Sequence, residues 1–105
     1  MWLPSPDMFE VKVSKQIEDL VSLFLENRRK DFDLLHAAIV AKDFTVLIQI
    51  GHRLKGVGAS YGFEQISAAG RAIEAAARDG DEALLTGLID DYGNYLGRLK
   101  VTYGE

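Results

Sequence analysis

The chain has no cysteine and only two prolines among its 105 residues. The lack of cysteine excludes disulfides and thiolate chemistry, and it favours a cytoplasmic setting. No run of about eighteen apolar residues occurs, so no membrane-spanning helix is expected. Residues 1–7 also lack the basic region and apolar core of an export signal. A chain of this length supports one domain with one modest hydrophobic core.

Positive charge is scarce as well, because 12 Lys and Arg stand against 16 Asp and Glu and give a net charge of −4. A nucleic-acid partner is therefore not expected, since phosphate backbones require a basic surface. The one concentrated basic run, Arg28-Arg29-Lys30, is flanked by Glu26 and Asp31. We interpret this run as a solvated helix face. The chain also has no glycine-rich phosphate loop and no recognisable nucleophile triad, which argues against an enzyme.

Apolar residues recur at spacings of three and four along most of the chain, which predicts helices. Residues 1–13 lack this period and are predicted to form an extended arm, after which Ser14 is a plausible N-cap. The first helical stripe lapses at Arg28, so any kink is expected within residues 27–30. The four predicted helices cover residues 15–42, the segment from Asp43 to Gly62, residues 63–79, and the segment from Asp81 to the end of the chain. Their short loops predict an all-α fold, an antiparallel up-down four-helix bundle over residues 14–105.

The second helix carries the most informative pattern. Its apolar stripe comprises Val46, Leu47, Ile50, Leu54, Val57 and Tyr61. His52 lies roughly 180° from the middle of this stripe and therefore points away from the core. Gly51, Gly56 and Gly58 each cost about 1 kcal/mol relative to alanine in a helix, so we expect a partner to need the space they leave. Lys55, one turn after His52, is placed to balance a negative group on the ring, an arrangement that suits phosphate on histidine.

The two histidines differ in their surroundings. His36 has no lysine or glycine one turn later, and we interpret it as a boundary residue at the edge of the core. The histidines are not at metal-ligand spacing and no cysteine accompanies them, so no metal site is predicted.

The segment His52-Arg-Leu-Lys55-Gly56-Val-Gly-Ala-Ser-Tyr-Gly62-Phe63 resembles the signature of histidine-containing phosphotransfer (HPt) domains. The resemblance covers roughly residues 17–99. It implies a phosphocarrier without catalytic activity of its own, with His52 as the phosphoacceptor. Members commonly place a Gln or Glu on the next helix to orient the ring, and Glu74 stands at that position. Beside it, Arg78 could add positive charge near the phosphoryl group together with Lys55, and the partner-docking surface would comprise Ile48, Gly51, Gly56 and Ala59.

The same resemblance implies the partners. They are response-regulator receiver domains, which supply Mg²⁺ and the catalytic aspartate, and a sensor or hybrid histidine kinase. No cofactor of its own and a monomeric state are expected. Met1 and the short tail after Leu99 favour a free-standing protein over a piece of a hybrid kinase.

Two alternatives stay open at this point. The stripe of Ser67, Arg71, Glu74 and Arg78 also fits a set of exposed intrahelical ion pairs worth a few tenths of a kcal/mol each. The chain as a whole also fits a helical-bundle adaptor that binds signalling partners through the His52 face without phosphate chemistry.

Overall fold

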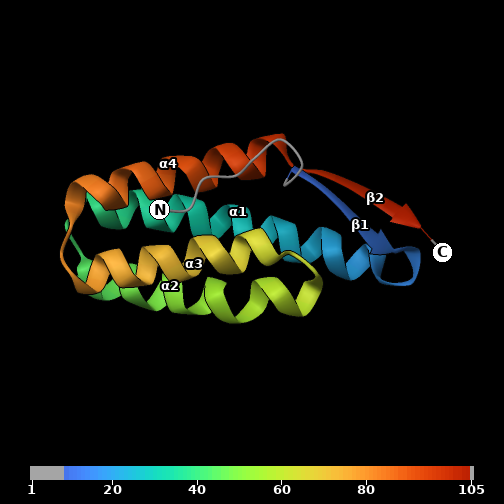
Figure 1. Cartoon of the computed structure of the whole chain (residues 1–105), viewed down its shortest axis with the longest axis horizontal. Helices are drawn as coiled ribbons and strands as arrows, with labels where there is room; N and C mark the ends of the chain where they lie inside the picture. The colour runs from blue at the N-terminus through green and yellow to red at the C-terminus, as the bar shows by residue number, and fades with distance from the viewer. Residues whose placement is uncertain (1–8, 105) are drawn as a thin grey trace.

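Four α-helices dominate residues 9–104, the part of the chain that the computed structural model describes (Figure 1). The helices are α1 (Glu18–Val40), α2 (Phe44–Gly58), α3 (Glu64–Arg78) and α4 (Glu82–Arg98). Each runs opposite in direction to the one before it, which confirms the predicted antiparallel up-down bundle (Figure 1). Residues 1–8 of the predicted arm lie outside the described residues.

The helix ends follow the capping residues in the sequence. The side chain of Asp43 accepts a hydrogen bond from the Val46 N–H at 3.2 Å, and Asp81 accepts one from Leu84 at 3.1 Å. Beyond α2, a short 3-10 turn over Ala59–Tyr61 ends at Gly62, whose φ of 86° lies in the left-handed region that glycine tolerates. These caps keep the loops short, so the helices lie alongside one another.

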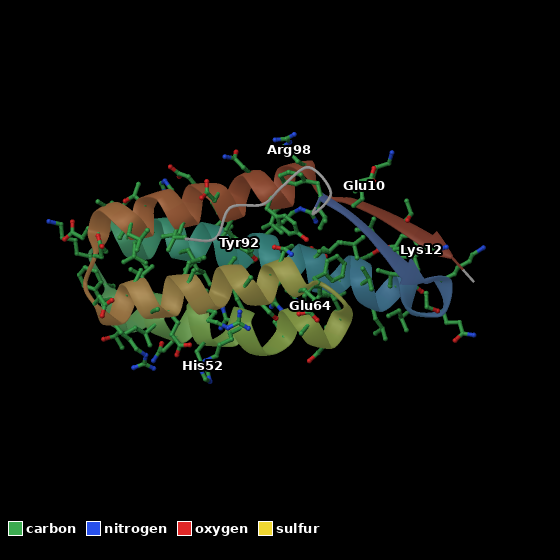
Figure 2. All side chains as sticks on the ribbon, in the orientation of Figure 1. Glu10, Lys12, His52, Glu64, Tyr92 and Arg98 are labelled. Atoms are coloured by element: carbon green, nitrogen blue, oxygen red, sulfur yellow. The ribbon has the colours of Figure 1, made fainter. Side chains whose placement is uncertain are left out.

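The core lies between the four apolar faces. Its fully buried members include Leu35, Leu47, Leu54, Ile66, Ile73, Leu85 and Leu88. Burying each such side chain stabilises the fold by about 1.5–3 kcal/mol relative to leaving it in water. Tyr92 on α4 is buried with them, and its hydroxyl donates a hydrogen bond to the backbone carbonyl of Arg28 at 3.1 Å (Figure 2).

A two-stranded parallel sheet at one end of the bundle pairs the segment before the helices with the segment after them (Figure 1). Strand β1 (Glu10–Ser14) pairs with β2 (Lys100–Gly104), with Glu10 opposite Lys100 and Ser14 opposite Gly104. The fourth helix was expected to continue to the end of the chain, and that expectation is wrong, since α4 stops at Arg98. Both strand segments carry β-branched or aromatic residues at alternate positions, Val11 and Val13 in β1 and Val101 and Tyr103 in β2, which suits a pleated strand better than a helix.

The start of the first helix also differs from the prediction. Ser14 caps a 3-10 turn (Lys15–Ile17) by accepting a hydrogen bond from the Gln16 N–H, and α1 itself begins at Glu18. The helix then runs unbroken through residues 27–30, where a kink had been considered.

Arg28 corrects the interpretation of the basic run. Its side chain is buried, whereas Arg29 and Lys30 are exposed. Arg28 Nε lies 2.9 Å from Asp31 Oδ2, and Arg53 of α2 reaches the other oxygen of the same carboxylate. The apolar stripe lapses at Arg28 because this arginine forms a buried ion pair with Asp31, and the contact of Arg53 with the same carboxylate links α1 to α2.

Candidate functional site

His52 projects from the outer side of α2. Leu47, Ile50 and Leu54 bury the opposite side of this helix in the core, so the helical period turns the histidine outward. Its side chain is 69% exposed, and Figure 2 shows it directed away from the bundle. The ring is therefore open to a partner, as the sequence pattern predicted.

Helix α3 approaches α2 closely next to His52. A Cβ atom on Gly51 would lie 2.7 Å from the Glu74 nitrogen, and one on Gly58 would lie 2.5 Å from the Ser67 nitrogen. Gly70 is in similarly close contact with the backbone of Lys55. These three glycines let the two helix backbones meet, as small residues at a helix interface do.

This contact corrects two expectations about the glycines of α2. Gly51 was expected on the partner-docking surface, but it is buried against α3 and cannot contact a partner. Gly58 is buried in the same way. Only Gly56 of the three is exposed, and a Cβ there would meet nothing within 4 Å.

Ser67 fastens the last turn of α2 to α3. Its hydroxyl donates to the Lys55 carbonyl at 2.9 Å and accepts from the Ala59 N–H at 2.7 Å. The hydroxyl thus stands between two backbone groups that are four residues apart, the pair that an α-helix would bond directly. This arrangement fixes the segment from Lys55 to Ala59 beside His52.

Glu74 is the electrostatic centre of the site. Its carboxylate Oε2 lies 3.2 Å from His52 Nδ1 and 3.0 Å from an Arg78 guanidinium nitrogen. The other oxygen, Oε1, lies 2.8 Å from Lys55 Nζ. The intrahelical pair of Glu74 with Arg78 that the pattern also allowed is present, but only its arginine is exposed, because Glu74 is buried with 6% of the residue exposed. The structure brings together His52, Lys55, Glu74 and Arg78.

These neighbours keep Glu74 ionised. Hydrogen bonds from Lys55 and then from Arg78 lower the pKa of Glu74 from 4.5 to about 2, although burial opposes the change. A carboxylate accepts hydrogen bonds and cannot donate them, so the proton between Glu74 and the ring belongs to His52 Nδ1. The lone pair of the imidazole is then on Nε2, the nitrogen available to an electrophile.

These four residues line an open depression of about 410 Å³ between α2 and α3. Arg71 and Ala75 complete its lining. Of the predicted docking residues, Gly56 and Ala59 are exposed on α2, whereas Ile48 is half-buried. The depression is large enough for a phosphoryl group and carries more basic than acidic side chains.

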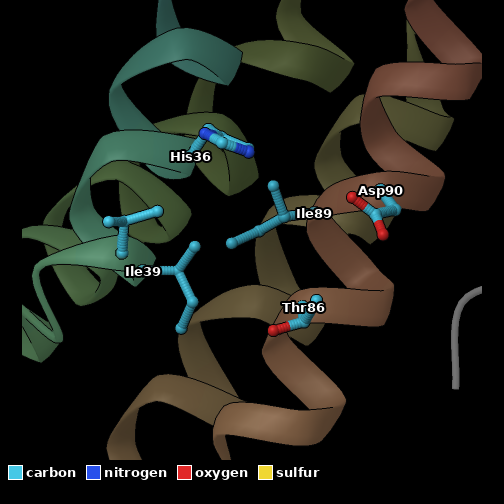
Figure 3. A pocket seen from close by; sticks show the side chains of 6 residues that line it. His36, Ile39, Thr86, Ile89 and Asp90 are labelled. Carbon is cyan, nitrogen blue, oxygen red and sulfur yellow. The ribbon is translucent and has the colours of Figure 1, made fainter.

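A second depression lies between α1 and α4 and includes His36 (Figure 3). Its floor is apolar, with Ile39 and Ile89, and Asp90 and Thr86 stand on the α4 side. The His36 ring packs near Phe32, with 6.3 Å between ring centroids. Among the described residues that line this depression there is no Lys or Arg, so they offer no positive charge to a phosphate on His36.

Three functional features were missed from the sequence. Ser67 was placed on an exposed stripe, and its hydroxyl gave no signal that it would bond the backbone of another helix. The sequence shows Asp31 only as a charge that flanks the basic run, although the lapse of the apolar stripe at Arg28 is a signal for a buried pair nearby. Arg71 was assigned only to an exposed ion-pair stripe, yet it lines the depression beside His52.

Comparison with protein-family models finds a match to the Hpt domain over residues 19–101. No curated protein and no solved structure gives a match. Within residues 9–104, no group of three or more His, Cys, Asp or Glu side chains is placed to hold a metal ion. None of the helices in that range has the length and apolar character needed to cross a bilayer.

Proposed function

Because the chain belongs to the Hpt domain family, we propose that His52 accepts a phosphoryl group and relays it to a response-regulator receiver domain. The donor is the aspartyl phosphate of another receiver domain or a sensor or hybrid histidine kinase. Hpt domains are phosphocarriers without independent catalysis. The chain therefore supplies a nucleophile and its surroundings, and the partner supplies the Mg²⁺ and the aspartate.

The observation that carries this proposal is the contact between an exposed histidine and a buried, ionised carboxylate. Glu74 accepts a hydrogen bond from His52 Nδ1 at 3.2 Å and also forms ion pairs with Lys55 and Arg78. A histidine with no function would gain little from such an arrangement, since its ring is mostly in water. A phosphoacceptor gains an oriented ring and nearby positive charge.

The transfer step follows from this geometry. The Nε2 lone pair attacks the phosphorus of the aspartyl phosphate, and the bond from phosphorus to the aspartate oxygen breaks. The aspartate leaves as a carboxylate, and the proton on Nδ1 stays in place. The imidazole gains positive charge as the N–P bond forms, and Glu74 stabilises that charge. The return step is the reverse, with a receiver aspartate as the nucleophile.

Docking of the partner uses the exposed part of α2. Gly56 lies one turn after His52 and leaves open space above the helix, so a receiver loop can approach the ring. Ala59 continues the same small-residue surface, and Ile48 borders the site on the other side of His52. We propose that the chain acts as a monomer in this encounter.

Transfer to the purified chain tests the proposal. The protein is incubated with a panel of receiver domains carrying labelled phosphate, and the label on the chain is tested for the acid lability and base stability of phosphohistidine. His52→Gln should abolish acceptance without a change in melting temperature, because the side chain is exposed. His36→Gln is the matched control and should accept the label normally.

Two results would contradict the proposal. Label that persists on His52→Gln would place the phosphate elsewhere. Stable binding of a receiver without transfer would favour the adaptor alternative instead.

A further inference from the structure

Arg71 is a basic residue of the site that takes no part in the ion pairs of Glu74. It is exposed on α3 and lines the same depression as His52. Its neighbour Gly70 packs against the backbone of Lys55 across the interface of α2 and α3. Arg71 therefore lies on α3 at the level of Lys55, which follows His52 by one turn on α2.

The other two cations of the depression are already engaged. Lys55 and Arg78 both bond to the carboxylate of Glu74. Within residues 9–104, the side chain of Arg71 forms no hydrogen bond or ion pair, so the five N–H donors of its guanidinium group are available. A guanidinium group binds phosphate oxygens in pairs, which an ammonium group does not.

The charge of the depression points to the same residue. Among the described residues that line the depression, Lys55, Arg71 and Arg78 are three cations opposed by one carboxylate, that of Glu74, which leaves two positive charges beside the ring. A phosphoryl group carries between about 1.5 and 2 negative charges near neutral pH, so it would neutralise this excess. Without Arg71 only one positive charge would remain for the dianion.

We propose that Arg71 is a further phosphoryl-binding residue, whose guanidinium contacts the phosphoryl group once that group is on His52. This inference rests on the proposed function, because it requires phosphorylation of His52. Binding by Arg71 favours the dianionic form of the phosphoryl group and stabilises the phosphorylated chain against loss of that group. It also gives α3 a direct contact with the phosphate, in addition to the indirect one through Glu74.

Phosphoramidate is a suitable probe because it needs no partner protein. The Nε2 lone pair attacks its phosphorus, the P–N bond breaks, and ammonia leaves while Nδ1 keeps its proton. The wild-type chain, Arg71→Gln, Arg71→Lys and Arg29→Gln are each incubated with phosphoramidate, and labelling of His52 is followed by mass spectrometry. Arg29 is an exposed arginine of α1 outside the depression, so Arg29→Gln controls for net charge. A phosphorus NMR titration of each phosphorylated protein then gives the pKa of the phosphoryl group.

Arg71→Gln should slow labelling about threefold and raise the phosphoryl pKa by about 0.5, the size expected for one exposed cation. Arg71→Lys should restore most of both effects, and Arg29→Gln should match the wild type. Equal values for Arg71→Gln and the wild type, or the same change in Arg29→Gln, would overturn the inference while leaving the relay function intact. Absence of label on His52 in the wild-type chain would overturn both. All variants should melt at the wild-type temperature, which separates a lost contact from a lost fold.

Discussion

Two glycines of α2 should respond in opposite ways to the same substitution. Gly51→Ala places a methyl group 2.7 Å from the Glu74 nitrogen and 3.0 Å from the Gly70 oxygen, and both of these are backbone atoms of α3. Neither atom can move without displacing the helix, so overpacking costs about 1–3 kcal/mol. The better helix propensity of alanine offsets about 1 kcal/mol, so a net loss of up to about 2 kcal/mol remains. Gly56→Ala meets nothing within 4 Å and should stabilise the domain by up to about 1 kcal/mol.

Thermal melting followed by circular dichroism separates the two outcomes. A change of 1 kcal/mol shifts the melting temperature of a domain of this size by about 4–8 °C. Gly51→Ala should therefore melt several degrees below the wild type, and it should also slow transfer because Glu74 is displaced from His52. Gly56→Ala should melt above the wild type, whereas Gly56→Gln should keep part of that gain and block docking of a receiver domain. A raised melting temperature for Gly51→Ala, or a lowered one for Gly56→Ala, would refute the assignment of these two glycines.

Three further results are expected. Lys55→Ala should slow transfer about tenfold without unfolding the bundle, since it removes a cation beside the ring and leaves a good helix former; an unchanged rate would make Lys55 a solvated surface residue. The pKa of Glu74 is lowered in the folded state from 4.5 to about 2, so its stabilising effect is complete above about pH 4.5 and lost as the pH falls toward 2. Urea unfolding at about pH 3 and pH 6 should show this loss in the wild type and less of it in Glu74→Gln. Asp31→Ala should cost about 3 kcal/mol because it leaves Arg28 buried without its carboxylate, whereas Arg53→Ala should cost less than about 1 kcal/mol, and equal costs would contradict the ion-pair assignment.

The helices were predictable because their signals are local. Asp43 and Asp81 begin helices as N-caps, and the three-and-four spacing of leucines identifies the buried faces. The terminal strands gave a weaker signal, since each has only five residues. Their pairing joins opposite ends of the chain, and period-two patterns this short do not specify such a partner.

The site was predictable to the extent that it depends on a single helix. The outward direction of His52 and the position of Lys55 follow from the period of α2 alone. The burial of Glu74 and the contacts of Ser67 depend on how closely α2 and α3 approach. Helix propensity and hydrophobic periodicity do not predict that distance. The glycines show the same limit. Gly56 is at an open position and Gly51 at a packed one, but both are glycine and only the atoms opposite them differ.

The close approach of α2 and α3 connects the packing of the bundle to its chemistry. Packed helices usually lie about 8–10 Å apart, and the smaller distances depend on small residues at the contact. Gly51 meets the backbone of Glu74 directly, and His52 is the next residue along α2. A larger residue in place of Gly51 would move Glu74 away from the His52 ring and expose its carboxylate to water. The carboxylate would then lose its contacts with His52, Lys55 and Arg78. The glycine before the histidine therefore acts on the orientation of His52 through helix packing, although it is itself buried against α3.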